Sequence, residues 1–478
     1  MKRRDFIKLS ANAALVLAFA GLGSPLCAAG NVTTPKTVVN LMLDGGPDFR
    51  HLIVPVYALS NNDSNSYAAK FWNARASLWG VSSTEDLKKA FSDNYDEFTL
   101  GGEKYGILKK CAWLKDEITA GNVAIVNNVI GSTNRDHHHS QIIMERGYID
   151  ANSHSLDASG WAGRAAKSLS ANVLSLSTTV RLVCNGPHAT DVSRHDNSCV
   201  ISNYYSRDTG LVNYDTQADL DEGNPRYKWS EEGIMSRSLS SYYSAKAPHV
   251  PTSSVFRKPI EHEIKVRNFG IPLEQRLDET PIPTSIANLA QRDHPNELDS
   301  STFAHQIQAL YDSYATQDIL NMRLASLDYT GWDSHKNLRT QIEPKFEDIF
   351  GRDRGLESLF TESTLLKSDC YANSVVVVSG EFGRQLKSNG DHGNDHGRGN
   401  TVLVIGKSVN GGMYGDPFPE YEKEFLEVKN RDIEGKTSLF KVYAEVLNWQ
   451  ENELGTTVFG DLSSHDVEDG VDLGRLFS

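Results

Sequence analysis

The loop at residues 388–400 carries two Asp-His-Gly triplets. Asp391 and His392 form the first acid–imidazole pair, and Asp395 and His396 form the second, four positions later. Carboxylate oxygens and imidazole nitrogens are common ligands of divalent metal ions, and glycines let the backbone turn tightly around them. The loop taken alone is also compatible with a solvated turn. A metal site here is therefore a hypothesis that other segments must support.

Five short apolar runs have the composition of buried β-strands. They lie at residues 37–43, 123–126, 320–329, 374–379 and 401–405. Helical patterns occur at 106–120, 303–319 and 338–360. Strands that alternate with helices predict an α/β fold with a mainly parallel central sheet flanked by helices. A Ser-, Tyr- and charge-rich stretch with scattered Pro, at about 203–283, is predicted to be an irregular insertion.

Side chains that bind metal ions or anions lie next to the predicted strand ends. They are Asp44, Arg135, Asp136, His137, Asp333, His335, Glu381, Arg384, Asp395 and His396. Because ligands of open α/β sheets bind beyond the carboxyl ends of the strands, we expect these residues to converge. Mixed Asp, Glu and His ligands suit Zn, Mn or Fe, and Ca where oxygen dominates.

Two arginines and a run of histidines could complete such a site. Arg135 and Arg384 have the planar guanidinium that binds phosphate or sulfate oxygens at two points. The alternative for Arg384 is an ion pair that fastens its own loop. Of the histidines at 137–139, we expect His137 to face the site and the others to cap a helix or face solvent.

The N-terminal segment predicts export. A twin-arginine pattern begins at Arg3, an apolar stretch follows at 11–22, and a small-residue cleavage site ends at Ala29. We expect a signal peptide at 1–29, passage through the twin-arginine translocase, and a mature domain at 30–478 in the periplasm or outside the cell. The apolar stretch is too short for a stable transmembrane span, so the cleaved chain is not expected to be an integral membrane protein.

The composition argues against several classes of function. A formal net charge of −14 disfavours binding to nucleic acid or to an anionic membrane. The cysteines form no CxxC pair, and haem, iron–sulfur and dinucleotide motifs are lacking, so a redox role has no support. Cys184 and Cys199 flank a polar loop and could pair in an oxidising compartment.

Several motifs occur in an order that resembles one known family. They are Leu43-Asp-Gly-Gly-Pro47, Arg135-Asp-His-His-His-Ser-Gln141, Gly160-Trp-Ala-Gly-Arg164, Gly331-Trp-Asp-Ser-His335, Ser379-Gly-Glu-Phe-Gly-Arg384 and Asp395-His-Gly397. The chain resembles the twin-arginine-exported bacterial family called domain of unknown function 1501. That family in turn resembles the alkaline phosphatase and sulfatase superfamily in fold. The resemblance covers most of the mature chain outside 203–283.

The resemblance implies roles for individual positions. In the phosphatase and sulfatase relatives, an Asp after the first strand binds metal, and Asp44 occupies that place. Asp333 and His335 match a later pair of ligands. His396, with Asp395 beside it, matches a late histidine ligand.

Two positions depart from the relatives' pattern. Their Asp-His pair falls on Glu381 and Phe382, of which only the glutamate can bind a metal. Their nucleophile, a hydroxyl or a modified cysteine, falls near Ser132 and Thr133. Asp136 stands where the family often has serine, so Thr133 or Ser132 would have to take that role.

Two functions follow from these expectations. The first is an exported metal-dependent hydrolase of phosphate or sulfate esters, polysaccharide esters among them. The second is a non-catalytic exported binding or assembly protein on a degenerate fold of the same kind, which Asp136 and Phe382 favour. A hydroxyl directed at the metal site from the start of the helix after Val126 would favour the hydrolase.

Overall fold

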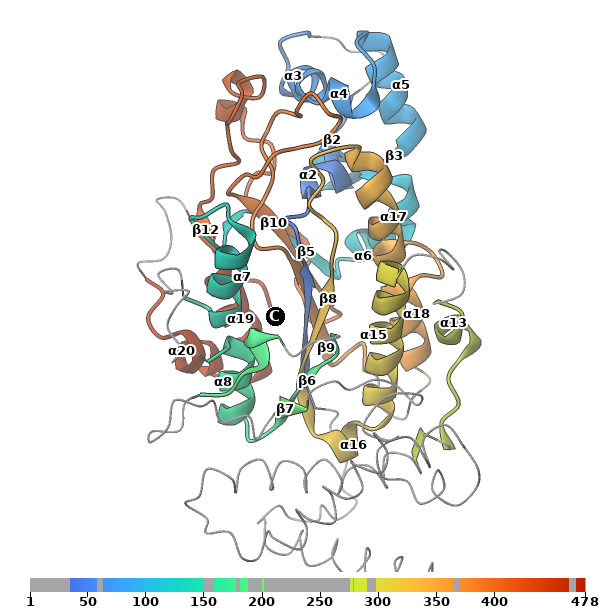
Figure 1. The fold of residues 1–478 in the computed structure, drawn as a ribbon, viewed down its shortest axis with the longest axis vertical. Coiled ribbons are helices and arrows are strands. Elements are labelled where there is room, and N and C mark those ends of the chain that lie inside the picture. Colours follow the sequence, from blue (N-terminus) through green and yellow to red (C-terminus); the bar gives the residue numbers. More distant parts are fainter. Residues whose placement is uncertain are drawn as a thin grey trace, which may run out of the picture.

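A central β-sheet runs through the molecule, with helices on both faces (Figure 1). The computed structural model describes residues 35–57, 63–148, 159–177, 181–187, 200–201, 276–277, 279–289, 298–364, 366, 370–463 and 470–477. The predicted signal peptide and nearly all of the predicted insertion lie outside these ranges. No helix within them is long and apolar enough to cross a membrane.

Within the described residues, nine strands form the central sheet. In spatial order they are β11 (Gly412–Tyr414), β5 (Val123–Ile130), β10 (Asn400–Ile405), β9 (Ser374–Ser379), β1 (Thr37–Leu43), β8 (Met322–Tyr329), β6 (Asn172–Ser175) and β7 (Val200–Ile201), with β12 (Thr437–Ser438) also paired to β5. The pairs are parallel except those of β10, which is antiparallel to β9 and β5. The predicted mainly parallel α/β architecture is confirmed.

The reversed direction of β10 brings a long loop to the edge where the parallel strands end. β1, β5, β8 and β9 all end at this edge because they point the same way. β10 begins there. The loop 380–399, which carries both Asp-His pairs, therefore lies beside the residues that follow the other strands.

The helices form one layer on each face of the sheet (Figure 1). One layer contains α15 (Leu298–Ala315), α17 (Leu338–Phe350) and α18 (Gly355–Ser363), with the shorter α6 (Ala112–Thr119), α13 (Thr284–Ala287) and α16 (Gln317–Leu320). The other contains α7 (His137–Arg146), α8 (Trp161–Ser168), α19 (Leu439–Gln450) and α20 (Leu454–Phe459). A hydrophobic core lies between the sheet and each helix layer. Side chains alternate along β1, so Val39 packs in the core under the first layer and Val38 in the core under the second.

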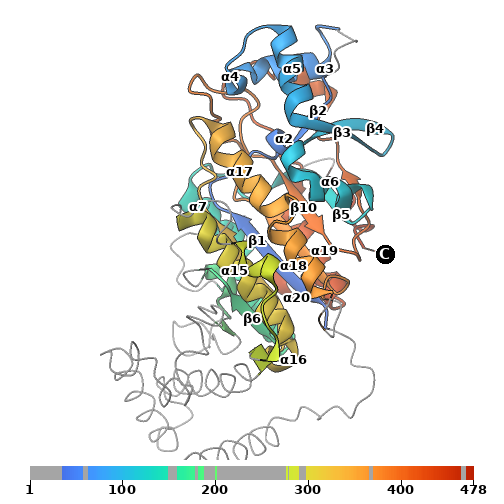
Figure 2. The ribbon, with the colours of Figure 1, turned by 90° about the vertical axis from the view of Figure 1, so that its right-hand side faces the viewer.

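A smaller antiparallel sheet lies beyond one end of the central sheet (Figure 2). It has the order β2 (Ile53–Pro55), β4 (Glu103–Leu108), β3 (Tyr95–Leu100), and is accompanied by α2 (Phe49–Leu52), α3 (Tyr67–Ala74), α4 (Ala76–Trp79) and α5 (Thr84–Asn94). Short 3-10 turns are η1 (Lys109–Cys111), η2 (Leu182–Cys184) and η4 (Glu420–Glu424).

Two predicted helices differ from the observed ones. The helix predicted from 106 begins only at Ala112, because Gly106 and Ile107 pair with β2 and β3 instead. The helix predicted over 338–360 is broken into α17 and α18. The break lies at Gly351, whose N–H still donates a hydrogen bond to the Glu347 carbonyl oxygen before the chain turns away.

Phe346 on α17 provides a test of this packing. Its side chain is fully buried, and its ring centroid lies 4.8 Å from that of Trp332. Phe346→Ala is expected to lower the free energy of unfolding by about 3–5 kcal/mol, since it leaves a cavity in the core. Urea unfolding measures this change. Val428→Ala, at a position that is 42 % exposed, is the control and should stay within about 0.5 kcal/mol of the parent. An equal change in the free energy of unfolding of both variants would contradict the burial of Phe346 in the core.

Candidate metal centre

Three histidines and one aspartate meet at the carboxyl edge of the central sheet. Asp333 and His335 follow β8, His396 lies in the loop before β10, and His137 begins α7 after β5. Ligand atoms of His137, Asp333 and His396 lie within 4.8 Å of one another. The structure therefore brings together residues that are far apart in the sequence.

The Nε2 atoms of the three histidines surround the Asp333 carboxylate. Asp333 Oδ1 lies 3.0 Å from His396 Nε2 and 3.1 Å from His335 Nε2. Asp333 Oδ2 lies 3.5 Å from His137 Nε2. The Nε2 atoms of His335 and His396 are 2.9 Å apart. Two ligands bound ~2.1 Å from one ion are about 3.0–3.4 Å apart. His137, Asp333 and His396, whose ligand atoms all lie within 4.8 Å of one another, are therefore the residues that could share a single metal ion, and His335 lies beside two of them.

Two of the histidines are oriented by carboxylates. His137 Nδ1 lies 2.7 Å from Glu381 Oε1, and His335 Nδ1 lies 3.0 Å from Asp395 Oδ1. An ionised carboxylate only accepts hydrogen bonds, so Nδ1 of each ring donates. Glu381 and Asp395, which were predicted to be metal ligands, therefore lie behind the histidines. Carboxylates commonly hold metal-binding imidazoles from this position.

The third histidine is oriented by the backbone. His396 Nδ1 lies 2.9 Å from the carbonyl oxygen of Arg135, so this nitrogen also donates. Each neutral ring then presents its Nε2 lone pair to Asp333. His137 Nε2 is buried and has no hydrogen-bond partner among the described residues. A buried polar atom without a hydrogen-bond partner costs roughly 1–3 kcal/mol of stability, and a metal ion bound to His137 Nε2 would supply the missing contact.

The ionisation of the cluster follows from these contacts. The hydrogen bond to Glu381 raises the pKa of His137, and burial lowers the pKa of His396. Burial acts to raise the pKa of Asp333, but the interactions with its neighbours, the hydrogen bond from Arg384 first among them, outweigh it and hold that pKa at about 2. Asp333 is therefore ionised at neutral pH and can serve as an anionic ligand.

Two glycines bring Glu381 to its place. The buried Glu381 carboxylate accepts hydrogen bonds from the N–H of Gly45 at 2.8 Å and of Gly46 at 3.2 Å. Gly45 has φ +121° and Gly46 has φ +69°, which other residues rarely adopt. A Cβ atom on Gly45 would lie 2.3 Å from the backbone nitrogen of Asp333. Glycine is therefore required where β1 approaches the loop after β8.

Arg384 is buried among backbone carbonyl groups rather than open to a substrate. Its guanidinium donates to the carbonyl oxygens of Gly45, Gly46, Trp332 and Asn394 and to the Asp333 carboxylate. All three guanidinium nitrogens are thus hydrogen-bonded within the protein. The geometry fits the alternative expectation, in which Arg384 fastens its loop, and not the expectation of a fork for phosphate or sulfate.

Asp44 lies outside the histidine cluster. Its carboxylate is bound at both oxygens by Arg181, with Nη2 at 3.1 Å from Oδ1. Burial raises the pKa of Asp44 to about 6, although Arg181 acts in the opposite direction. The Asp44 carboxylate, which was predicted to bind metal, is therefore paired with the Arg181 guanidinium. Arg181 follows none of the predicted strands, so no sequence pattern identified it.

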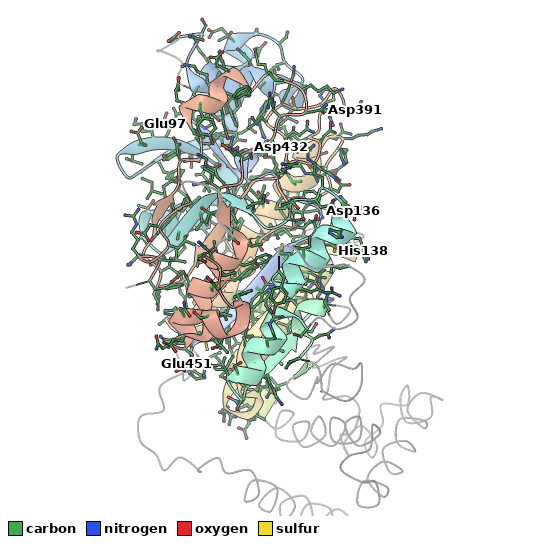
Figure 3. The ribbon with its side chains drawn as sticks, turned by 90° about the vertical axis from the view of Figure 1, so that its left-hand side faces the viewer. Glu97, Asp136, His138, Asp391, Asp432 and Glu451 are labelled. Atoms are coloured by element: carbon green, nitrogen blue, oxygen red, sulfur yellow. The ribbon has the colours of Figure 1, made fainter. Side chains whose placement is uncertain are left out.

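The candidate nucleophiles lie at the start of α7. Asp136 is the N-cap of this helix, and its side chain accepts a backbone hydrogen bond in the first turn at 2.8 Å. Ser132 is fully buried, with its Oγ 3.1 Å from Ser140 Oγ, whereas Thr133 is exposed. Figure 3 shows Asp136 and His138 at the outer end of α7. Asp136 is thus used as a helix cap, and Thr133 offers the more accessible of the two hydroxyls.

Arg135 lies at the rim of the cluster in an ion pair with Asp432. Arg398 Nε is 3.7 Å from the same Asp432 oxygen. Burial raises the pKa of Asp432 despite both arginines. Two guanidinium groups share one carboxylate, which leaves one positive charge in excess beside His396. Neither Asp432 nor Arg398 was predicted: Asp432 follows no predicted strand, and Arg398 belongs to none of the motifs although it lies two residues after His396.

The first Asp-His pair of the loop has a structural role. The backbone carbonyl of Asp391 accepts a hydrogen bond from Asn337 N–H at 3.1 Å, and that of His392 accepts one from Leu338 N–H at 2.9 Å. These contacts hold the loop to the start of α17. The His392 side chain is exposed. Only the second pair, Asp395 and His396, contributes to the candidate centre.

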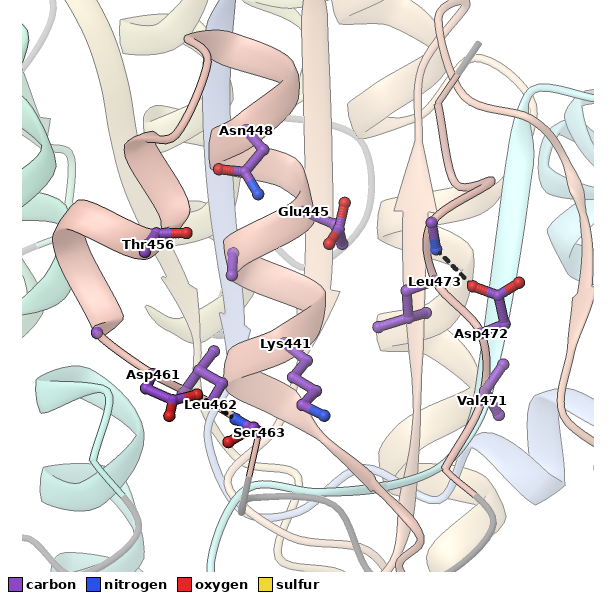
Figure 4. Close-up of a pocket in the computed structure, with 13 residues that line it drawn as sticks. Lys441, Glu445, Asn448, Thr456, Asp461, Leu462, Ser463, Val471, Asp472 and Leu473 are labelled. Atoms are coloured by element: carbon purple, nitrogen blue, oxygen red, sulfur yellow. Dashed lines mark hydrogen bonds between the residues drawn. The ribbon is translucent and has the colours of Figure 1, made fainter.

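A cavity of about 630 Å³ lies elsewhere, along α19 and α20 (Figure 4). Lys441, Glu445 and Asp472 are among its lining residues. Burial, reinforced by the charge of Asp472, raises the pKa of Glu445. Its lining includes none of the three clustered histidines, so the candidate centre is separate from this cavity.

The raised pKa of Asp44 predicts a pH-dependent stability. Because its folded-state pKa of about 6 exceeds the ordinary value of 3.8, the folded protein binds this proton more tightly than the unfolded chain. The resulting stabilisation, about 3 kcal/mol, is present below about pH 4 and is lost as the pH rises through about 6. Urea unfolding from pH 4 to 7 should show this loss in the parent relative to Asp44→Asn. If the difference in unfolding free energy between the parent and Asp44→Asn stays constant from pH 4 to 7, the raised pKa of Asp44 is contradicted.

Residues 316–433 match a family model described as "Protein of unknown function (DUF1501)". No curated protein matches the chain. The matched stretch contains Asp333, His335 and His396, whereas His137 lies outside it. The match supports the resemblance to the DUF1501 family over the part of the chain that carries most of the cluster.

Proposed function

We propose that the chain is an exported metal-dependent hydrolase of phosphate or sulfate esters, polysaccharide esters among them. One observation carries the proposal: three imidazole Nε2 atoms converge on the Asp333 carboxylate, and each ring is held by an acceptor at Nδ1. Three lone pairs beside a carboxylate repel one another unless a cation lies between them. Imidazole rings whose Nδ1 is held by an acceptor and whose Nε2 is left free are typical of metal-binding histidines.

The donor set limits the metal. Imidazole nitrogens together with one carboxylate suit Zn, Mn or Fe. Ca prefers a set dominated by oxygen ligands, so it is the least suitable of the four metals considered from the sequence.

The chain's own residues prepare the site for an anionic ester. A divalent ion bound there supplies Lewis-acid chemistry for ester hydrolysis. Glu381 and Asp395 fix the histidine rings, and Asp333 provides negative charge. Arg135 and Arg398 place an excess positive charge at the rim, where it would attract phosphate or sulfate.

A second candidate function is a non-catalytic exported binding or assembly protein that holds the ion without turnover. The use of Asp136 as a helix cap and the burial of Ser132 favour it, because neither group is then available as a nucleophile. Thr133 is the hydroxyl that the hydrolase proposal retains. Export through the twin-arginine translocase to the periplasm or beyond belongs to both proposals and rests on the sequence at 1–29.

Metal content tests the centre. Protein purified from the periplasm should contain bound Zn, Mn or Fe by elemental analysis. His137→Ala should lose it, because one of the ligands is removed. Asp395→Asn should weaken binding by about 10–100-fold, since it alters only the acceptor behind His335. The matched control is His138→Ala, an exposed neighbour on the same helix turn, which should keep the metal. Full retention by His137→Ala would refute the centre.

Turnover separates the two candidate functions. The metal-loaded protein is assayed with p-nitrophenyl phosphate, p-nitrophenyl sulfate and a sulfated polysaccharide. The hydrolase proposal expects release of phosphate or sulfate that stops on chelation and returns when Zn²⁺ or Mn²⁺ is added. A protein that binds metal but turns over none of these esters would favour the binding function.

A further inference from the structure

The loop that carries His396 is bound to the region of the smaller sheet through a buried asparagine. Asn394 is fully buried, and its side-chain amide donates to Asp48 Oδ2 at 2.6 Å. Asp48 directly precedes α2, and Arg75 binds both of its carboxylate oxygens, at 2.7 and 3.2 Å. Arg75 lies between α3 and α4. Asn394 therefore connects a buried ion pair of that region to a candidate metal ligand two positions further along the chain.

The hydrogen-bonding roles in this contact are fixed. Burial acts to raise the pKa of Asp48, but its neighbours, the Arg75 guanidinium first among them, outweigh burial and hold that pKa below its usual value. Asp48 is thus an ionised acceptor, and only the amide nitrogen of Asn394 can donate to it. Asn394 Oδ1 is buried and has no hydrogen-bond partner among the described residues. Within that part of the chain, Asp48 is therefore the group that orients the amide.

The backbone of Asn394 joins two segments that carry the candidate ligands. Its N–H donates to the carbonyl oxygen of Ser334 at 3.1 Å, and Ser334 lies between Asp333 and His335. Its carbonyl oxygen accepts a hydrogen bond from Arg384 Nη1 at 3.0 Å. One residue thus fixes the loop before β10, the loop after β8 and the region of the smaller sheet relative to one another.

A second contact from the same region supports this arrangement. Ser77 on α4 donates through its hydroxyl to the carbonyl oxygen of Asn389 at 2.8 Å. The amide of Asn389 in turn donates to Asp395 Oδ1 at 3.1 Å, and the same oxygen holds His335 Nδ1. Asn389, like Asn394, therefore lies between the α3–α4 segment and the residues that form the candidate centre.

We infer that Asn394 is a positioning residue through which the Arg75–Asp48 pair sets the affinity of the candidate centre for its metal ion. The inference rests on the metal centre proposed above. Ligands from two loops bind one ion tightly when both loops are already in place, because ordering them on binding costs conformational entropy. A purely structural asparagine would contribute to the stability of the fold but would leave the affinity of the folded protein for metal unchanged.

The experiment titrates the metal-free mature protein with Co²⁺, whose visible absorption reports both the amount bound and the coordination geometry. The parent should bind Co²⁺, and Asn394→Ala should bind it about 10–100-fold more weakly, as substitutions behind metal ligands do. Asn394→Asp should bind it more weakly still, because a carboxylate then faces Asp48. Combining Asn394→Asp with Asp48→Asn places one amide and one carboxylate at this contact again. The double variant should recover most of the lost affinity and the absorption spectrum of the parent.

Asn172→Ala is the matched control, because Asn172 is a buried asparagine at the start of β6, away from the carboxyl edge, whose amide donates to the Leu320 carbonyl oxygen. It should lower the midpoint of urea unfolding and leave the Co²⁺ affinity and spectrum unchanged. If Asn394→Ala folds by circular dichroism and binds Co²⁺ as tightly as the parent, the inference is overturned.

Ser77→Ala decides the question if Asn394→Ala does not fold, because it removes a single hydroxyl from a half-buried position. It should weaken Co²⁺ binding several-fold through the loss of its contact with Asn389. A Ser77→Ala protein that binds Co²⁺ as tightly as the parent would overturn the inference in that case.

The two proposals fail in different ways in this experiment. A parent that binds no Co²⁺ refutes the metal centre, and the inference about Asn394 falls with it. If the parent binds Co²⁺ and the folded Asn394 variants bind it equally well, the centre is retained and the role of Asn394 is refuted.

Discussion

Two opposite charges, three residues apart, hold the same pair of glycines at the end of β1. Glu381 accepts hydrogen bonds from the N–H groups of Gly45 and Gly46, and Arg384 donates to the carbonyl oxygens of the same two residues. The turn after β9 therefore binds the turn after β1 on both sides of its backbone. Both charged side chains are buried, and removing either one would leave the backbone groups that it binds without partners, at a cost of about 1–3 kcal/mol for each buried group.

The candidate centre is built outward from this contact. The Glu381 oxygen that binds Gly45 also orients His137, so one atom links β1 to α7. Arg384 continues to the Trp332 carbonyl and to Asp333, which fixes the loop after β8. The indole of Trp332 in turn packs against α17 in the core. The position of each ligand therefore depends on packing that lies well away from it.

The sequence predicts the framework well and the atomic roles less well. The apolar runs at 37–43 and 374–379 coincide with β1 and β9, because a buried parallel strand is apolar throughout. A strand-end pattern indicates which residues meet, and the histidines do meet. It does not indicate which atoms face each other, so Glu381 was predicted to be a ligand although it lies behind one. Arg181 could not be found at all, since its partners lie on three elements that only the fold brings together.

Two neighbouring groups of acidic residues, one at the candidate metal centre and one around Arg181, have similar charge but different ligand atoms. The group around Arg181 consists of Asp44, Glu145 and Asp328. Asp333, Glu381 and Asp395 carry three negative charges against the one positive charge of Arg384, and the Arg181 cluster has the same ratio. Both groups thus lack about two positive charges. Only the first group includes imidazole nitrogens, which are common ligands of transition-metal ions. The second consists of oxygen acceptors, which suit the planar donors of arginine. Donor type, rather than charge, therefore decides which of the two is suited to a transition-metal ion.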